Sequence, residues 1–246
     1  REGSCPMDTY ALHDLGALPS GNPYPGRGIV VGKSGDGRFA AVAYFIMGRS
    51  ENSRNRVFAA TEDGIRTQAF DPAKLKDPSL IIYHPVRRLG NQLIVTNGDQ
   101  TDTVRDGLLN GESFSQALSR RCFEPDGPNW TPRISAMLTF ADGDFTYEMS
   151  ILKSADAEGT ACSRFTFSYP ALSGVGHFLH TYVTDGNPVI PTFQGEPERV
   201  AVGNDPEAFA AQVWDSLNAD NKVSLYINWI DLATGEESVR IFNKNQ

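Results

Sequence analysis

Short apolar and β-branched runs alternate with loops rich in Gly and Asp, a pattern that predicts strands joined as hairpins. In the clearest case, Gly28 to Lys33 and Phe39 to Met47 are joined by Ser34-Gly35-Asp36-Gly37, whose glycines can adopt the positive φ of a tight connection. Two more hairpins and a further strand are predicted at Ile134 to Phe140 with Phe145 to Leu152, at Val223 to Ile230 with Ser238 to Phe242, and at Gln92 to Thr96. So many strands require a second layer to pack against.

Helical signals are fewer. Asp205 can cap a helix that has Pro206 in its first turn and runs from about Glu207 to Leu217. The helical period brings four apolar residues of this segment onto one face, which we expect to be core: Phe209, Val213, Trp214 and Leu217.

A second helical region is expected from about Thr103 to Leu118, with a break near Asn110-Gly111. Its inward residues would be Val104, Leu108, Phe114 and Leu118. Strand-rich segments with helices at intervals predict an α+β fold. Neither a repeat nor a low-complexity linker divides the chain, so we expect a single domain over residues 1–246, with residues 1–22 as a peripheral lead-in.

Composition narrows the function classes. The 246 residues are 40% hydrophobic and carry a formal net charge of -8, which argues against a general nucleic-acid or anionic-membrane surface. The sequence lacks both a run of about 20 apolar residues and the apolar core of a signal peptide, so we expect a cytoplasmic protein. The three cysteines, an odd number without paired spacing, fit neither a disulfide framework nor a zinc site and are expected to be free thiols: Cys5, Cys122 and Cys162.

Within this acidic chain, the segment from Arg49 to Arg56 holds three arginines among small polar residues, directly after a predicted strand. Guanidinium groups match phosphate and carboxylate oxygens, so the segment could cradle an anion. A solvated turn whose arginines pair with surface carboxylates is the alternative. Any phosphate-bearing ligand should be small and held locally.

Two other polar blocks follow or precede predicted strands. Asn97 to Asp102 lies between a strand and a helix start, where short polar residues can cap the helix or contribute to an anion site. Asp126 to Arg133 leads into the next strand, and its two prolines restrict the backbone before Arg133. By itself, each block also fits an ordinary turn or cap.

Taken together, these segments resemble the archaeal-type IMP cyclohydrolase family, most clearly over residues 23–152. The resemblance is carried by Gly26 to Gly32, Arg49-Ser50 with Asn55-Arg56, Asn97-Gly98 with Thr101-Asp102, and Asn129 with Thr131-Pro132-Arg133-Ile134. The chain departs from the archaeal pattern at Trp130, which interrupts an Asn-Thr-Pro-Arg-Ile run, and at Asp99-Gln100, which replaces a Ser-His pair. The greater length and the loop 186–197 indicate a bacterial-style branch.

The resemblance implies a four-layer αββα sandwich of two mainly antiparallel sheets flanked by helices. This layering is similar to that of N-terminal-nucleophile hydrolases, without their terminal nucleophile. It also implies ring closure of 5-formamidoimidazole-4-carboxamide ribotide to IMP and water, the last step of de novo purine biosynthesis, with no metal or other cofactor. The expected partner is therefore a small purine ribotide, with no nucleic acid and no membrane, and a homo-oligomer is left open.

Carried over through the matching motifs, the resemblance makes Tyr83 a donor to the formyl oxygen and Glu124 a proton shuttle, with Arg56 as the third catalytic residue. Arg49, Arg56 and Arg133 would hold phosphate, carboxamide or formyl oxygens. The expected substrate-binding residues are Arg27, Arg49, Ser50, Asn55, Asn97, Thr101, Asp102, Asn129, Thr131 and Arg133.

Three alternatives stay open. His84, His177 and His180 could serve acid-base chemistry, although a spacing of three in a strand sends His177 and His180 to opposite faces. Amide hydrolysis would require Cys5 to become the first residue by processing after Ser4. A non-enzymatic module would retain the arginines for ribotide binding and have lost turnover.

Overall fold

The computed structural model describes residues 8–246, and Cys5 lies outside them. All three predicted hairpins form: β1 (Arg27–Lys33) with β2 (Phe39–Met47), β7 (Arg133–Ala141) with β8 (Asp144–Ser154), and β12 (Lys222–Asp231) with β13 (Glu237–Asn243). The β7–β8 turn places Asp142 and Gly143 at φ angles of 52° and 72°, the pair of positive values that a two-residue hairpin loop of this twist needs.

The strands form two sheets whose neighbours are all antiparallel. The six-stranded sheet has the order β11-β10-β1-β2-β12-β13, and the seven-stranded sheet has the order β3-β4-β5-β6-β7-β8-β9. The remaining strands are β3 (Arg56–Ala60), β4 (Gly64–Ala69), β5 (Val86–Leu89), β6 (Gln92–Thr96), β9 (Cys162–Pro170), β10 (Val175–His180) and β11 (Glu198–Ala201).

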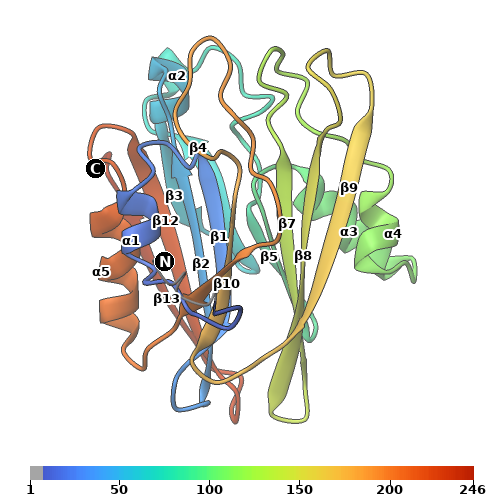
Figure 1. Ribbon diagram of the computed structural model, residues 1–246, viewed down its shortest axis with the longest axis vertical. Helices are drawn as coiled ribbons and strands as arrows, with labels where there is room; N and C mark the ends of the chain where they lie inside the picture. Colours follow the sequence, from blue (N-terminus) through green and yellow to red (C-terminus); the bar gives the residue numbers. More distant parts are fainter. Residues whose placement is uncertain (1–7) are drawn as a thin grey trace, which may run out of the picture.

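Burial on both faces explains why the central strand β2 reads as one apolar run. Every second residue, including Val42 and Tyr44, points into the core between the sheets. The residues between them, including Ala43 and Phe45, face helix α5 (Pro206–Ser216) and the segment around α1 (Ala17–Ser20). Helices α3 (Gln100–Leu109) and α4 (Phe114–Leu118) cover the outer face of the other sheet. Figure 1 shows the resulting four layers, so the predicted αββα sandwich is confirmed.

Helix α5 matches its prediction, with the Asp205 side chain accepting a hydrogen bond from the Glu207 backbone N–H at 2.9 Å. Its apolar face is buried except at Trp214, which is partly buried. The second region breaks as expected, with Gly111 at a φ of +79° between α3 and α4. Helix α3 begins three residues earlier than predicted, because the Gly98 and Asp99 carbonyls already accept helical-type bonds.

Antiparallel order brings several predicted site segments to one end of the sandwich. Strand β1 begins and β2 ends there, and so do the start of β7 and the end of β6. The segment after β2 includes the short helix α2 (Glu51–Arg54) and leads into β3, and the chain after β4 passes through a short 3-10 turn, η1 (Pro72–Lys74). Residues far apart in sequence therefore meet between the sheets at this end.

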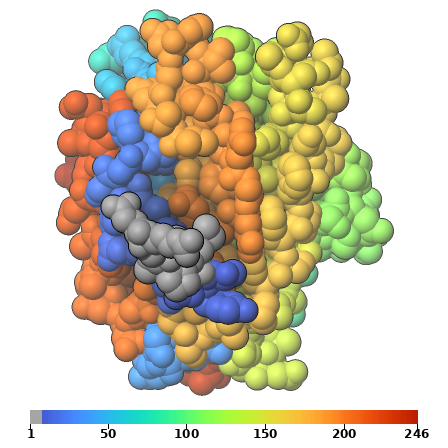
Figure 2. All heavy atoms as spheres, viewed as in Figure 1, coloured from blue at the N-terminus to red at the C-terminus, as the bar shows by residue number. Residues whose placement is uncertain are grey.

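The segment of residues 183–197, after β10, links the two sheets at the surface. The Lys153 ammonium on β8 donates to the Phe193 carbonyl at 2.7 Å, and the Ile190 N–H donates to the Asn129 side chain at 3.0 Å. In Figure 2 this orange segment lies over the seam between the sheets. Among residues 8–246, the structure holds no helix that combines the length and the apolar character needed to span a membrane.

Candidate active site

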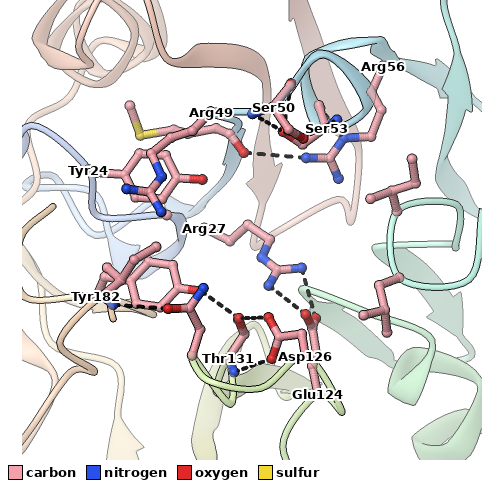
Figure 3. A pocket seen from close by; sticks show the side chains of 16 residues that line it. Tyr24, Arg27, Arg49, Ser50, Ser53, Arg56, Glu124, Asp126, Thr131 and Tyr182 are labelled. Carbon is pink, nitrogen blue, oxygen red and sulfur yellow. Dashed lines mark hydrogen bonds and ion pairs between the residues drawn. The ribbon is translucent and has the colours of Figure 1, made fainter. Parts of the chain in front are cut away.

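The loops at this end enclose a cavity of about 300 Å³ (Figure 3). Its walls come from the start of β1, the β2–β3 segment, the loop before β5, the loop before β7 and the segment after β10. They comprise Tyr24, Gly26, Arg27, Met47, Arg49, Ser50, Ser53, Arg56, Leu80, Ile81, Glu124, Asp126, Asn129, Thr131, Tyr182 and Ile190.

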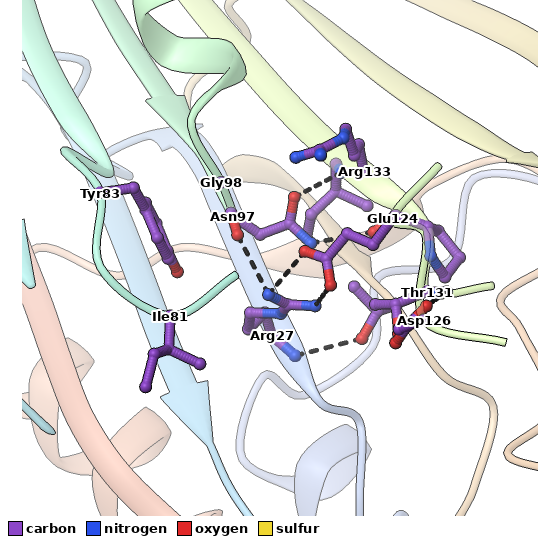
Figure 4. Close-up of polar contacts among 12 residues, drawn as sticks. Arg27, Ile81, Tyr83, Asn97, Gly98, Glu124, Asp126, Thr131 and Arg133 are labelled. Carbon is purple, nitrogen blue, oxygen red and sulfur yellow. Dashed lines mark hydrogen bonds and ion pairs between the residues drawn. The ribbon is translucent and has the colours of Figure 1, made fainter. Parts of the chain in front are cut away.

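A bidentate ion pair lies on one side of this cavity. Arg27 Nη1 lies 2.9 Å from Glu124 Oε1, and Arg27 Nη2 donates to Glu124 Oε2 at 3.1 Å. Arg27 also donates to the Asn97 carbonyl at 3.1 Å, which joins the two sheets (Figure 4). Burial raises the pKa of Glu124, and the positive charge of Arg27 opposes this rise without cancelling it. A carboxyl group in this setting is suited to take up and release a proton.

Arg56 is the buried cation of the cavity, with only 2% of its surface exposed. Its Nε donates to the Ser53 carbonyl at 2.7 Å and its Nη2 to the Met47 carbonyl at 3.4 Å, while Nη1 has no partner. No carboxylate of residues 8–246 forms an ion pair with it. Burial lowers the pKa of Arg56, as expected for a cation without a counter-charge. The Nη1 of Arg56 is therefore available to a polar or anionic ligand.

Arg49 lies nearer the surface. Its Nη1 donates to Asp185 Oδ1 at 2.6 Å and to the Gly186 carbonyl at 2.8 Å, and its guanidinium lies 5.2 Å from the centre of the Tyr24 ring. Ser50 caps helix α2, so its hydroxyl and that of Ser53 are 2.9 Å apart. The run of arginines is thus divided between the cavity and the surface, since Arg54 reaches away to Asn221.

Tyr83 does not line this cavity and instead borders an adjacent hollow. Its ring is buried, and its hydroxyl lies 2.6 Å from the hydroxyl of Tyr44. Figure 4 shows Tyr83 on one side of the Arg27 guanidinium and Glu124 on the other.

Trp130 shows how the chain accommodates its departure from the archaeal pattern. It adopts a positive φ of 45°, its indole packs on Gly127 and Gly159, and its Nε1 donates to the Ala157 carbonyl at 2.9 Å. Because this residue turns outward, Asn129 and Thr131 on either side of it both line the cavity.

The Thr131 hydroxyl forms hydrogen bonds with the Asp126 carboxylate and the Tyr182 hydroxyl. Tyr182 in turn stacks on Tyr24, with ring centroids 5.8 Å apart. These contacts give the cavity a rigid wall that is partly aromatic.

Arg133 lies behind Glu124, and the second departure holds it in place. Its Nη1 donates to Asp99 Oδ1 and to Gln100 Oε1, both at 3.0 Å. Asp99 also pairs with Arg121 at 2.6 Å. The Asp99-Gln100 pair therefore directs Arg133 away from the cavity lining and leaves Arg27 as the direct partner of Glu124.

The structure brings seven of the expected residues to the cavity: Arg27, Arg49, Ser50, Arg56, Glu124, Asn129 and Thr131. It does not bring Asn55, Asn97, Thr101 or Asp102 to the lining. Asn55 bonds the backbone of Asp71, Thr101 bonds Thr96, and Asp102 pairs with Arg87. Asn97 meets the site through its carbonyl, while its side chain bonds the backbone of Pro132 and Ile134.

Four polar or aromatic lining residues were not anticipated: Tyr24, Ser53, Asp126 and Tyr182. Tyr24 and Tyr182 are more than 150 positions apart in the sequence, and nothing in either local pattern marks a binding residue. Ser53 and Asp126 lay within segments singled out for other residues.

The histidines lie elsewhere. His177 points between the sheets, where its Nδ1 is 2.6 Å from the Tyr147 hydroxyl, and His180 points to the opposite face and pairs with Glu198, as their spacing predicted. His84 borders the hollow beside Tyr83. In the described part of the chain, no cluster of three or more His, Cys, Asp or Glu side chains is arranged to hold a metal ion.

Comparison with known proteins points to one family. A family described as IMP cyclohydrolase-like protein matches residues 24–236. The IMP cyclohydrolase of Methanococcus maripaludis strain C6 is 36% identical over 124 residues, which cover 47% of this chain and 58% of that protein. The IMP cyclohydrolase of Methanopyrus kandleri is 32% identical over 146 residues, covering 55% of this chain and 72% of that protein.

The match thus spans little more than half of the Methanococcus maripaludis protein, but the family match extends well beyond residue 152, where the motif resemblance weakened. Together with the sandwich and the cavity that its motifs form, these matches place the chain in the IMP cyclohydrolase-like family.

Proposed function

We propose that this protein is an IMP cyclohydrolase, which closes 5-formamidoimidazole-4-carboxamide ribotide to IMP with release of one water. The proposal rests above all on the buried, uncompensated Arg56 guanidinium beside the Arg27–Glu124 pair. A buried cation without a counter-charge is costly unless an anionic or strongly polar ligand completes its surroundings. A purine ribotide meets this demand.

The phosphate would lie at the outer end of the cavity. Arg49, Ser50 and Ser53 are there, and Arg49 and Ser50 also border the open groove next to it. Guanidinium and hydroxyl donors suit phosphate oxygens. Arg49 would leave Asp185 and turn to the phosphate, a change that costs little because the ion pair is exposed.

The reacting groups would then lie between Arg56 and the Arg27–Glu124 pair. The carboxamide nitrogen is a poor nucleophile because its lone pair is delocalised, so the site must hold it against the formyl carbon of the same molecule. Asn129 and Thr131, on the rigid wall, would orient the carboxamide and ring.

During closure, the carboxamide nitrogen bonds to the formyl carbon and loses one of its two protons. The formamido nitrogen then loses its proton as it forms a double bond to that carbon, and the formyl oxygen leaves with both protons as water. Arg56 would donate to that oxygen as it gains negative charge. Tyr83 lies behind the cavity lining, beside Arg27, and would donate to the same oxygen when the ribotide extends past Arg27. Glu124, whose pKa is raised by burial, would take the proton from nitrogen and return it to the departing oxygen. Arg27 would keep the carboxylate in place through both transfers.

Turnover of the ribotide by the purified protein, followed as IMP formation against the uncatalysed rate without added metal, tests the proposal. Glu124→Gln and Tyr83→Phe are each expected to lower kcat by about 100-fold or more, because each removes a proton-transfer or oxyanion group. Binding without turnover would instead support a ribotide-binding module. Absence of both would refute the assignment.

The pH profile gives a second test of the Glu124 role. Because burial raises the pKa of Glu124, activity that needs its carboxylate falls on the acidic side at a pH above the usual range of glutamate. Glu124→Gln should remove that limb from the profile of the residual activity. An unchanged limb would assign the titration to another group.

A further inference from the structure

Tyr44 lies beneath the site, in the core between the sheets. It is fully buried, and its ring stacks on Phe58 with centroids 5.6 Å apart. Its hydroxyl is 2.6 Å from that of Tyr83. Within residues 8–246, no other group hydrogen-bonds the Tyr44 hydroxyl.

The partners available to the two hydroxyls determine which of them donates the hydrogen bond. If Tyr83 donated to Tyr44, the Tyr44 proton would be left in apolar surroundings without an acceptor, which is unfavourable. If Tyr44 donates to Tyr83, its own proton is satisfied and the Tyr83 proton is released for another acceptor.

The neighbouring charges offer no competing acceptor. Arg27 and Arg56 are the cations whose fields act on both hydroxyls, and guanidinium groups only donate. Among residues 8–246 no protein group accepts the Tyr83 proton, so this proton is available to an oxygen that a ligand brings beside Arg27 and Arg56.

We propose that Tyr44 is a positioning residue that donates to the Tyr83 hydroxyl and thereby directs the Tyr83 proton toward the ligand. This inference rests on the proposed cyclohydrolase function, in which the acceptor is the formyl oxygen. Tyr44 itself touches no substrate.

Tyr44→Phe isolates this role because it keeps the ring and its packing. Tyr226→Phe is the matched control: Tyr226 is the cross-strand neighbour of Tyr44 on β12, is equally buried, and has its hydroxyl 3.0 Å from Asn228 Nδ2. Tyr44→Phe should lower kcat about tenfold and change KM less than about twofold, because it removes one hydrogen bond that acts in the transition state. Tyr226→Phe should leave both constants near wild type.

Coupling between the two tyrosines provides a stricter criterion. The Tyr44→Phe/Tyr83→Phe double variant should be no slower than Tyr83→Phe alone, since Tyr44 acts through Tyr83. Independent, multiplicative losses, or equal losses in Tyr44→Phe and Tyr226→Phe, would overturn the proposal.

A spectroscopic measurement tests the inference without turnover. The probe is 5-formamidoimidazole-4-carboxamide ribotide, added to Glu124→Gln protein so that the formyl oxygen is retained. In this protein, labelled with ¹³Cζ-tyrosine and assigned with the two Phe variants, the ribotide should shift the Tyr83 resonance more than that of Tyr44, and adding Tyr44→Phe should reduce this shift. No shift of Tyr83, or the same shift with Tyr44→Phe, would contradict the role of Tyr44. If the shift is present but the wild type does not cyclise the ribotide, the enzymatic assignment fails while the proton-directing role of Tyr44 stands.

Discussion

At the residue scale, environment separates arginines that the sequence places side by side. Arg54 and Arg56 are two positions apart, yet Arg54 is exposed and Arg56 is buried. Both bond backbone carbonyls, but of the two only Arg56 has a buried donor without a partner. A residue that costs stability in the free protein in this way is expected to serve a ligand.

Arg56→Met tests this trade-off. Removing the buried charge should leave the melting temperature at or above that of the wild type, because the cost of desolvation disappears. The Kd for IMP should rise by more than about tenfold, since a charge-assisted contact is lost. Calorimetric titration and thermal melts give both quantities. Arg54→Met serves as control and should bind normally, whereas a large loss of stability in Arg56→Met would show that Arg56 is structural.

Arg49 and Asp185 allow a paired prediction. Arg49→Ala should weaken IMP binding by about tenfold while changing the free energy of unfolding by less than about 1 kcal/mol, because an exposed ion pair adds little stability. Asp185→Asn should tighten binding instead, since phosphate no longer competes with a carboxylate. Equal affinity in Arg49→Ala would remove this residue from the site.

At the scale of elements, loops positioned by the strand ends create the site. The turn around Trp130 keeps Asn129 and Thr131 on one wall, and the Asp99-Gln100 corner at the start of α3 holds Arg133. These departures from the archaeal pattern thus change the residues behind the cavity lining, while the lining itself stays polar.

Asn97 connects β6 to β7 at this corner. Its side chain accepts from the Ile134 N–H and donates to the Pro132 carbonyl, both at 2.9 Å, in a fully buried position. Asn97→Ala should therefore lower the free energy of unfolding by about 2 kcal/mol, since it leaves buried backbone groups unpaired.

Denaturant titration measures this loss. Asn91→Ala is the control, because Asn91 also donates to a β7 carbonyl, that of Phe140, but from an exposed position. Its effect should stay within about 0.5 kcal/mol. Similar small effects in both variants would show that the Asn97 side chain does not hold β6 to β7.

At the scale of the whole molecule, the core between the sheets makes folding depend on pH. His177 is 4% exposed, and its Nδ1 accepts from the Tyr147 hydroxyl in the neutral form. Burial lowers the pKa of His177 from 6.5 to about 4. Between about pH 4 and pH 6.5, the unfolded chain therefore binds a proton at His177 that the folded protein does not bind.

The free energy of unfolding should have its full value above about pH 6.5. It should fall as the pH drops toward 4, and His177 should account for about 3 kcal/mol of this loss. His177→Phe keeps an aromatic ring against Tyr169 and should flatten this slope, even if its stability at pH 8 is lower. Urea titrations across the range would reveal it. An equally steep slope in the variant would assign the pH dependence to other groups.

The sequence by itself determined three hairpins, strand β6, helix α5, the broken helical region and most of the candidate chemistry. Hairpins, caps and the apolar face of α5 depend on neighbouring residues, so local patterns predicted them, and the motifs indicated the family and the arginines. The tertiary structure alone decided which residues meet. The antiparallel order of two sheets brings Tyr24 to Tyr182, Arg27 to Glu124 and Tyr44 to Tyr83. It also buries Arg56 without a counter-charge, because burial depends on contacts between distant segments that no local pattern records.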